Sequence, residues 1–403
     1  MIRKLQKLLV PVLSVLLLSG CWSKKELNDL ALVSAIGLDK NEKGKYVGSF
    51  QIVNPGNVVG GENTGGGSKS PPVTVYTAEG NNLVGVSRNA SAHVSRILYY
   101  AHTNIVVIGE EIAREEGIMK LLDALDRDPN FRITTTIVIA HDATAEQLIN
   151  TLTPIDKIPA NKILKMLRST EKSSGEHLEI KTSDVLEALV TKGKEPVVTG
   201  IRATGGKIGM EMENIQRTEP SSAIEANGIA IFKAGKLIDW AHGRSARGIV
   251  WVLNRIKEAD VSVDWNNEKD SIVFEVIRQN TKVTPIIKNG DPEINIHVEV
   301  EGDIGEMQTA ADLNNPETIK KIEEKINKQI KNEVEKGIAK AQENKSDIFG
   351  FGDSFHNNYP NEWKKYENEW NDTYFPELKV NVTVQSFIRR TGLRTKPFLS
   401  NTK

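Results

Sequence analysis

Hydrophobic positions in the first half of the chain follow two patterns in turn. Short apolar runs, which are typical of strands, are separated by stretches in which apolar residues recur at the three- and four-residue spacing of helices. We predict strands at 30–38, 46–53, 73–79, 103–108, 132–140 and 196–202, and helices at 82–99, 111–126, 143–150, 159–170 and 182–192. Because strands and helices alternate from residue 73 onward, this half is predicted to be an α/β layer.

In the second half, strands follow one another with little helix between them. We predict strands at 224–232, 236–240, 259–265, 271–287, 293–301 and 377–388, and a helix around 245–257. Asn289-Gly290 is a hairpin-type turn between two of these strands. Runs of consecutive strands favour antiparallel pairing, so this half is predicted to be α+β.

One long helix is predicted ahead of the last strand. Asn315 provides an N-cap, Pro316 fits the first helical position, and the pattern continues to about residue 344. The apolar residues of this helix form one narrow stripe: Ile319, Ile322, Ile326, Ile330, Val334 and Ile338. A partner helix could use the stripe, but docking on the protein's own sheet is the favoured interpretation. The predicted fold class is therefore α/β and α+β, multi-domain, with an N-terminal α/β part and a C-terminal antiparallel-sheet part that holds one long helix.

Composition marks the boundaries of these parts. Residues 203–222 lack a sustained apolar period and hold three Gly, two Ser and one Pro, which indicates a linker. Residues 54–72 have a similar Gly-rich composition and are predicted to form a surface loop of unassigned role. The predicted divisions are a lipoprotein signal peptide at 1–20, an N-terminal α/β domain or domains at 21–202, the linker at 203–222, and a C-terminal α+β domain at 223–403.

The first twenty residues have the pattern of an export signal. Basic residues precede an apolar run at 8–18, which is too short to cross a bilayer of about 30 Å. The run stops at Leu18-Ser19-Gly20-Cys21, which looks like a bacterial lipobox. Cys21 is therefore the predicted lipid attachment site, and the rest of the chain is predicted to lie outside the cytoplasm. The alternative is an ordinary signal peptide with an incidental Cys.

Charge and motif content argue against several classes of function. The chain has 52 basic and 53 acidic residues, whereas a protein that neutralises many nucleic-acid phosphates usually carries a basic excess. Its one Cys excludes an intramolecular disulfide and a Cys-rich zinc site. The seven His form no HExxH or HxH motif, and no GxSxG nucleophile motif occurs. We therefore predict no enzyme activity, no cofactor, no metal site and no nucleic-acid partner.

Aromatic residues gather between residues 349 and 375. Trp363, Tyr366 and Trp370 have the spacing of one helical face. The favoured interpretation is a hydrophobic seam that packs a short helix on the second sheet. The alternative is a partner surface or an anchor at the level of the lipid headgroups, because Trp and Tyr favour both environments.

Several short stretches together resemble the C-type lipoproteins of bacterial spore germinant receptors, the Ger(x)C family. The resemblance runs from the lipobox through the C-terminal strand. The matching stretches are Cys21-Trp22, Lys25-Glu26-Leu27, Ala31-Leu-Val-Ser-Ala-Ile-Gly-Leu-Asp39, Glu79-Gly80, His102, Ile105-Val-Val-Ile-Gly-Glu110, Asp126-Arg-Asp-Pro129, Gly228-Ile-Ala-Ile-Phe232, Arg247-Gly-Ile-Val-Trp251, Asp347-Ile-Phe-Gly-Phe-Gly352, Trp363 and Trp370. One departure is Ser23, where the family more often has an acidic residue.

The resemblance implies a non-catalytic receptor component on the extracytoplasmic face of the spore inner membrane, anchored through acylated Cys21. Its implied partners are the A and B subunits of the germinant receptor, and the implied role is nutrient-triggered germination. The runner-up is a solute-binding lipoprotein of an importer, which would have two similar lobes around a ligand cleft. A third interpretation, a lipid-anchored cell-wall hydrolase, requires a carboxylate or metal site that the sequence does not reveal.

Overall fold

Strands with almost no polar residues form the centre of a large mixed sheet. The structure, a computed structural model, describes residues 26–58 and 71–391. The sheet has the order β3-β2-β1-β5-β6-β7-β8-β9, and β4 also pairs with β1. Its strands are β1 Leu30–Lys40, β2 Tyr46–Val53, β3 Val73–Gly80, β4 Ile97–Tyr99, β5 Ile105–Gly109, β6 Thr136–Ala140, β7 Val197–Ala203, β8 Ile224–Lys233 and β9 Lys236–Ala241.

The central strands β1, β5, β6 and β7 run parallel, and the outer strands β2, β3, β8 and β9 pair antiparallel. All five residues of β5 are buried because helices cover both faces of the sheet. Ile105 and Val107 pack with residues of the helices on one face, whereas Val106 and Ile108 pack with residues of those on the other. The covering helices are α3 Leu83–Ser91, α4 Glu110–Glu115, α5 Met119–Asp126, α6 Ala145–Asn150, α7 Pro159–Ser173 and α8 Thr182–Val190.

Two predicted helices are shorter in the structure. The helix predicted at 82–99 ends at Ser91, because residues 97–99 leave the helical path and pair with β1 as β4. The helix predicted at 111–126 divides into α4 and α5 at Gly117, whose φ of 80° lies in the left-handed region that glycine favours. A Cβ atom at Gly117 would lie 2.6 Å from the carbonyl oxygen of Gly235, so the β8–β9 turn occupies the space at this break.

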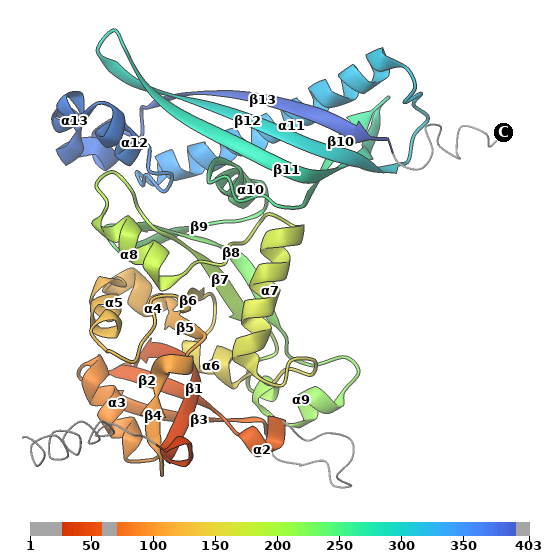
Figure 1. Ribbon diagram of the computed structural model, residues 1–403. Coiled ribbons are helices and arrows are strands. Elements are labelled where there is room, and N and C mark those ends of the chain that lie inside the picture. The colour runs from red at the N-terminus through yellow and green to blue at the C-terminus, as the bar shows by residue number, and fades with distance from the viewer. Residues whose placement is uncertain (1–25, 59–70, 392–403) are drawn as a thin grey trace, which may run out of the picture.

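A second sheet lies at the other end of the molecule, beyond β9 (Figure 1). Its order is β10-β11-β12-β13, with β10 Ala259–Trp265, β11 Glu268–Lys288, β12 Asp291–Met307 and β13 Lys379–Arg390. The first three strands are antiparallel, as predicted, but β13 runs parallel to β12. The predicted antiparallel pairing therefore holds for three of the four strands, and β13 departs from it. A parallel neighbour needs a crossover connection, and residues 308–378, which hold the long helix and the aromatic segment, provide it.

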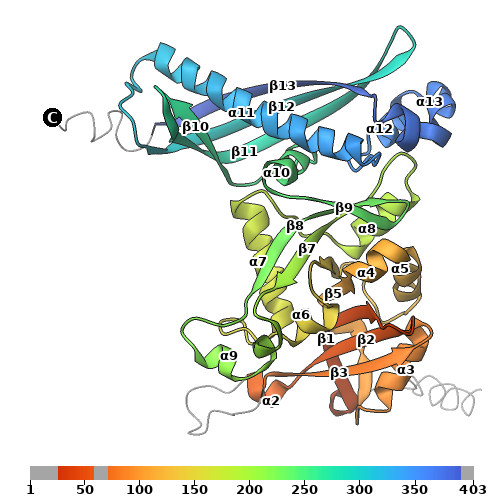
Figure 2. The ribbon, with the colours of Figure 1, turned by 180° about the vertical axis from the view of Figure 1, so that it is seen from behind.

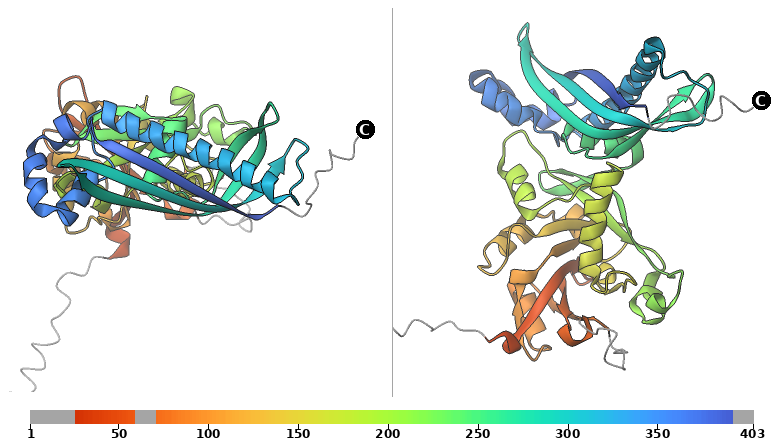
Figure 3. Two further views of the ribbon diagram at one scale, coloured as in Figure 1. Left: turned by 90° about the horizontal axis from the view of Figure 1, so that it is seen from above. Right: turned by 45° about the vertical axis from the view of Figure 1, so that its right-hand side comes forward.

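The long helix α11, Pro316–Glu343, covers one face of this second sheet (Figure 2). Asn315 caps its first turn by accepting a hydrogen bond from the N–H of Glu317. Five residues of the predicted apolar stripe are buried: Ile322, Ile326, Ile330, Val334 and Ile338. Seen from above, α11 lies beside β13 across the top of the molecule (Figure 3). The stripe is thus used within the chain, which confirms the favoured interpretation, and the two sheets confirm the predicted fold class.

The segment predicted as a linker is folded. It contains a short 3-10 helix at Gly206–Met210 and the short helix α9, Glu213–Gln216. Buried Asn214 donates to the carbonyl oxygens of Leu152 and Ser222. On its far side β8 pairs with β7, so backbone hydrogen bonding of the large sheet continues across residues 203–222. The division of the chain into domains at these residues stays a prediction.

Helix α10, Gly243–Val252, lies between the two sheets and crosses α11 closely (Figure 1). The two backbones meet at Gly248 and Gly337, and a Cβ atom on Gly248 would lie 1.9 Å from the carbonyl oxygen of Glu333. Nearby, Trp251 donates to the Glu333 carboxylate at 3.0 Å. Glycine is therefore required for the helices to approach this closely.

We expect Gly248→Ala to lower the free energy of unfolding by about 1 to 3 kcal/mol, because the added methyl group must push α10 away from α11. Denaturant unfolding of the variant measures this loss. Arg244→Ala in the exposed first turn of the same helix is the matched control and should change stability by less than about 0.5 kcal/mol. Equal stability of the two variants would contradict the close-packing argument.

Candidate functional site

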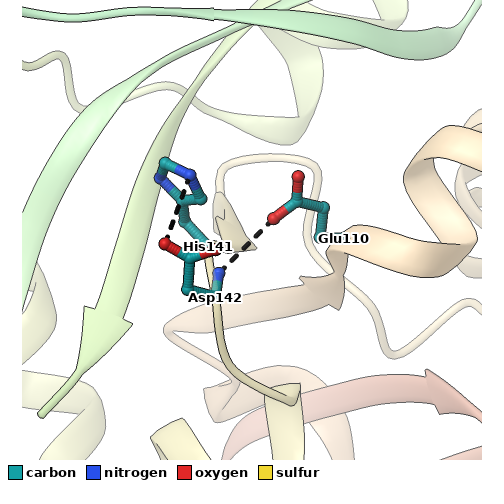
Figure 4. Close-up of side chains that lie close together, drawn as sticks. All are labelled: Glu110, His141 and Asp142. Carbon is teal, nitrogen blue, oxygen red and sulfur yellow. Dashed lines mark hydrogen bonds and ion pairs between the residues drawn. The ribbon is translucent and has the colours of Figure 1, made fainter.

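Polar side chains gather where the parallel strands of the large sheet end. Because β1, β5 and β6 are parallel, their carboxyl ends lie at one edge of the sheet, the place where open α/β sheets usually bind ligands. Asp39 lies near the end of β1, Glu110 follows β5 directly, and His141 and Asp142 follow β6. Figure 4 shows Glu110, His141 and Asp142 side by side at this edge.

The imidazole of His141 is held on two sides. Its ring stacks on Trp240 of β9, with ring centroids 3.9 Å apart and an angle of 8° between the planes. Its Nδ1 lies 3.2 Å from the carbonyl oxygen of Asn227. A carbonyl oxygen only accepts hydrogen bonds, so Nδ1 carries the proton and Nε2 keeps its lone pair in the neutral ring. Nε2 lies 3.7 Å from Oδ2 of Asp142.

The two oxygens of Glu110 have different surroundings. Oε1 accepts hydrogen bonds from Nε1 of Trp240 at 3.0 Å and from Nε of Arg114 at 2.8 Å. Oε2 faces the backbone N–H of Asp142 at 3.4 Å. Burial acts to raise the pKa of Glu110, but the hydrogen bonds from Trp240 and Arg114 outweigh it and leave the pKa below its ordinary value. The group is therefore a carboxylate at neutral pH.

Asp142 and Asp39 have different roles at the same edge. Asp142 is exposed and has a φ of 53°, a left-handed conformation that Asp and Asn tolerate better than most residues. Asp39 accepts hydrogen bonds from the first two N–H groups of α6, those of Ala145 and Glu146, at 2.8 and 2.9 Å. Asp39 thus caps the N-terminus of α6, and its burial raises its pKa.

The aromatic residues singled out in the sequence lie inside the protein. Trp363 and Tyr366 belong to α13, Pro360–Tyr366, whereas Trp370 begins the following π-helical turn. Their exposed fractions are 1%, 8% and 2%. The rings of Trp363 and Trp370 meet edge to face with centroids 5.2 Å apart. The hypothesis that these side chains present an exposed partner surface is therefore wrong for the folded chain, because they pack against one another and against α12, Phe351–Asn358.

Asp347 organises this aromatic segment. It is fully buried, and its carboxylate accepts hydrogen bonds from the backbone N–H groups of Phe349, Phe351 and Gly352 and from Nε1 of Trp370. Burial raises its pKa to about 6, although the four donors act in the opposite direction. The sequence showed Asp347 only as one carboxylate among many. Its position ahead of the Gly350 and Gly352 turn is the local signal of a carboxylate that caps a loop.

A concave apolar site lies elsewhere in the N-terminal layer. A cavity of about 410 Å³ opens between α3, α5 and the face of β1. Its lining includes Leu38, Phe50, Val86 and Leu125, and the Tyr100 hydroxyl at its wall shares a hydrogen bond of 2.6 Å with a neighbouring serine. Aliphatic and aromatic carbon dominates the lining, so the cavity is apolar in character.

The predicted attachment residue Cys21 lies outside the described residues. Within residues 26–58 and 71–391, no helix is long and apolar enough to span a bilayer.

The structure brings together Glu110, His141 and Asp142, which the search for sequence motifs missed because β5 and β6 are far apart along the chain. Their only signal in the sequence is that they come directly after short, mainly apolar strands.

The fold, a large mixed sheet and a smaller sheet with α10 between them, is similar to that of a solved structure. The solved structure described as "Crystal Structure of the GerBC protein" has this fold, with a TM-score of 0.55. The match covers 88% of this chain and 96% of that chain at 17% sequence identity.

The chain belongs to the GerAC-like family of spore germination proteins. Residues 23–203 match the family described as "Spore germination protein N-terminal domain", and residues 227–392 match "Spore germination B3/ GerAC like, C-terminal". Spore germination protein KC of Bacillus subtilis (strain 168) is 44% identical over 399 residues, which cover 98% of each chain. Spore germination protein GerQC of Bacillus cereus is 23% identical over 95% of this chain and 97% of its own.

Proposed function

We propose that this chain is the lipid-anchored C-type component of a spore germinant receptor, and that it takes part in nutrient-triggered germination without catalysing a reaction. One observation carries the proposal: the similarity to Spore germination protein KC extends over 98% of both chains, so it includes both sheets. The membership of the family supports a role in spore germination.

The proposed lipid attachment site is Cys21, which follows an apolar run and two small residues. Two acyl chains at about 0.8 kcal/mol per buried CH₂ hold a protein on a bilayer, where one short chain would not. The body would then lie on the extracytoplasmic face of the spore inner membrane. There it would contact the A and B subunits of the receptor, and it would need no membrane-spanning helix of its own.

The alternative, a solute-binding lipoprotein of an importer, is not favoured. That class would show two similar lobes around a cleft, whereas this chain has a large mixed sheet with helices on both faces and a small sheet with one long helix. A nutrient panel tested by calorimetry on the full chain discriminates the two. Submicromolar binding of one nutrient by the chain alone would favour the alternative.

We expect Cys21→Ala in the full chain to remove the protein from the spore membrane fraction and to lower the germination response, because the chain has no other Cys whose thiol could carry a lipid. Membrane fractionation after a high-salt wash and a germination assay measure the two effects. Ser23→Ala, which leaves Cys21 in place, is the matched control and should behave like the unaltered chain. Retention of Cys21→Ala in washed membranes with normal germination would refute the anchor.

Co-purification tests the partners. A tag at the C-terminus of the full chain should recover the A and B subunits from solubilised spore membranes. Recovery of neither protein from a strain that germinates normally would contradict the proposed place of this chain in the receptor.

A further inference from the structure

Three side chains, one from the start of α4 and two from the loop after β6, meet at the carboxyl edge of the large sheet. One atom each of Glu110, His141 and Asp142, an imidazole nitrogen and two carboxylate oxygens, lie within 4.8 Å of one another (Figure 4). Helix α4 follows β5 directly and carries Glu110, and the loop after β6 carries the other two residues. The parallel strands therefore place the three groups together without any local sequence motif.

His141 is oriented as metal-binding histidines are. Its Nδ1–H is directed at the carbonyl oxygen of Asn227, and this contact leaves the lone pair of Nε2 on the side of Asp142. Metal-ligating histidines almost always donate their other ring N–H to a carbonyl or carboxylate, which fixes the tautomer and the ring orientation. The stack on Trp240 immobilises the ring further.

The charges at this edge are unbalanced. Glu110 uses Oε1 for Trp240 and Arg114, which leaves Oε2 directed towards Asp142. Among the described residues, Arg114 is the one cation in an ion pair with the cluster, against the two carboxylates of Glu110 and Asp142. A divalent cation would balance this excess and would find three suitable ligands.

We propose that Glu110, His141 and Asp142 bind one divalent transition-metal ion of the Zn²⁺ type, through Oε2, Nε2 and Oδ2 respectively. Zn²⁺ holds nitrogen and oxygen ligands at about 2.0 to 2.2 Å, which places neighbouring ligand atoms about 3.4 Å apart in a tetrahedral site. The separation of 3.7 Å between Nε2 and Oδ2 is already close to that spacing. Asp142 is exposed, so its side chain can adjust, and a water molecule would complete the coordination.

The imidazole decides the kind of ion. Mg²⁺ and Ca²⁺ prefer oxygen ligands throughout, whereas imidazole together with carboxylate suits Zn²⁺ and its neighbours. The bound ion would join the loop after β6 to the start of α4. Because Trp240 contacts both Glu110 and His141, β9 would be held at the same point.

Calorimetric titration with Zn²⁺ tests the site on the full chain in detergent, with Cys21→Ala introduced so that no thiol competes for the metal. We expect saturable binding of one Zn²⁺ per chain and a higher melting temperature in its presence, because the ion binds the folded state only. Mg²⁺ at the same concentration should leave both measurements unchanged.

Asp142→Asn and Glu110→Gln in this background should each weaken Zn²⁺ binding at least about tenfold. Asn tolerates the left-handed φ at position 142, so the first variant keeps the fold. The matched control is His297→Ala, which removes a histidine with Glu299 3.4 Å from its Nε2 on the second sheet. This variant should bind Zn²⁺ as the unaltered background does.

Two results would overturn the proposal. One is the lack of saturable Zn²⁺ binding by the background chain. The other is an Asp142→Asn variant that melts normally and binds Zn²⁺ as tightly as His297→Ala. Equal affinity for Mg²⁺ would contradict the assignment to a transition metal. The proposed role in germination is tested separately, by the membrane fractionation and co-purification experiments.

Discussion

Trp370→Ala is expected to lower the free energy of unfolding by about 3 to 5 kcal/mol, because truncation of a buried Trp leaves a large cavity. The side chain is 2% exposed, contacts Trp363, Phe355 and Phe375, and donates its N–H to Asp347 at 2.7 Å. Denaturant unfolding of the full chain measures the loss. Such a loss is a large share of the roughly 5 to 15 kcal/mol that stabilises a folded domain.

Two further variants test whether the burial of the aromatic side chain determines the loss of stability. Trp363→Ala should cost about as much as Trp370→Ala, since Trp363 is 1% exposed. Phe387→Ala, at an aromatic residue that is 38% exposed on β13, is the control and should cost less than about 1 kcal/mol. Unchanged unfolding of both Trp variants, together with lost co-purification of the receptor partners, would restore the partner-surface hypothesis.

Asp347→Ala is expected to cost about 3 kcal/mol or more, because it leaves four buried donors without their acceptor. The loop at residues 193–195 should also lose stability, because it is hydrogen-bonded to the segment that Asp347 organises. The backbone N–H of Glu195 donates to the carbonyl oxygen of Asp347, and the N–H of Asp353 donates to the carbonyl oxygen of Gly193. Asp353→Ala, in the same segment but only partly buried, is the matched control and should cost less than about 1 kcal/mol.

The pKa of Asp347 adds a pH dependence with a definite sign. Burial raises the pKa of this group from 3.8 to about 6, so the folded chain binds the proton more tightly than the unfolded chain. Its contribution to stability is fully present below about pH 4 and is lost as the pH rises through 6, by about 3 kcal/mol at 1.4 kcal/mol per pKa unit. Unfolding should therefore be measured at pH 4.5 and 7.5 for the unaltered chain and for Asp347→Asn. The free energy of unfolding of the unaltered chain minus that of the variant should be lower at pH 7.5 than at pH 4.5. A higher value at pH 7.5 would contradict the raised pKa.

Local patterns were sufficient for most of the strands and for the long helix. The apolar runs that became β5 and β6 are buried on both faces, and such strands read as continuous hydrophobic stretches. The cap at Asn315 and the stripe of α11 were visible because capping and helical spacing involve residues within one or two turns of each other. The lipobox at Cys21 is a motif of the same local kind, and lipidation there stays a prediction.

Helix ends and strand direction were not decided locally. The helix predicted at 82–99 could have continued by its own spacing, but residues 97–99 gain backbone partners on β1. The break at Gly117 lies against the β8–β9 turn, which is remote in sequence. The parallel direction of β13 follows from the crossover through α11, because the side-chain alternation of a strand is the same in either direction.

The sequence by itself determined the fold class, the order of nearly all elements, the docking face of α11 and the family resemblance, because these depend on residues close together in the chain. Only the tertiary structure decided that Trp363, Tyr366 and Trp370 are interior, that Asp347 receives four donors, and that Glu110 meets His141 and Asp142. The physical reason is that burial and ligand geometry depend on which strands become neighbours. β5 and β6 are separated along the chain by α4 and α5, and they become neighbours only in the folded sheet.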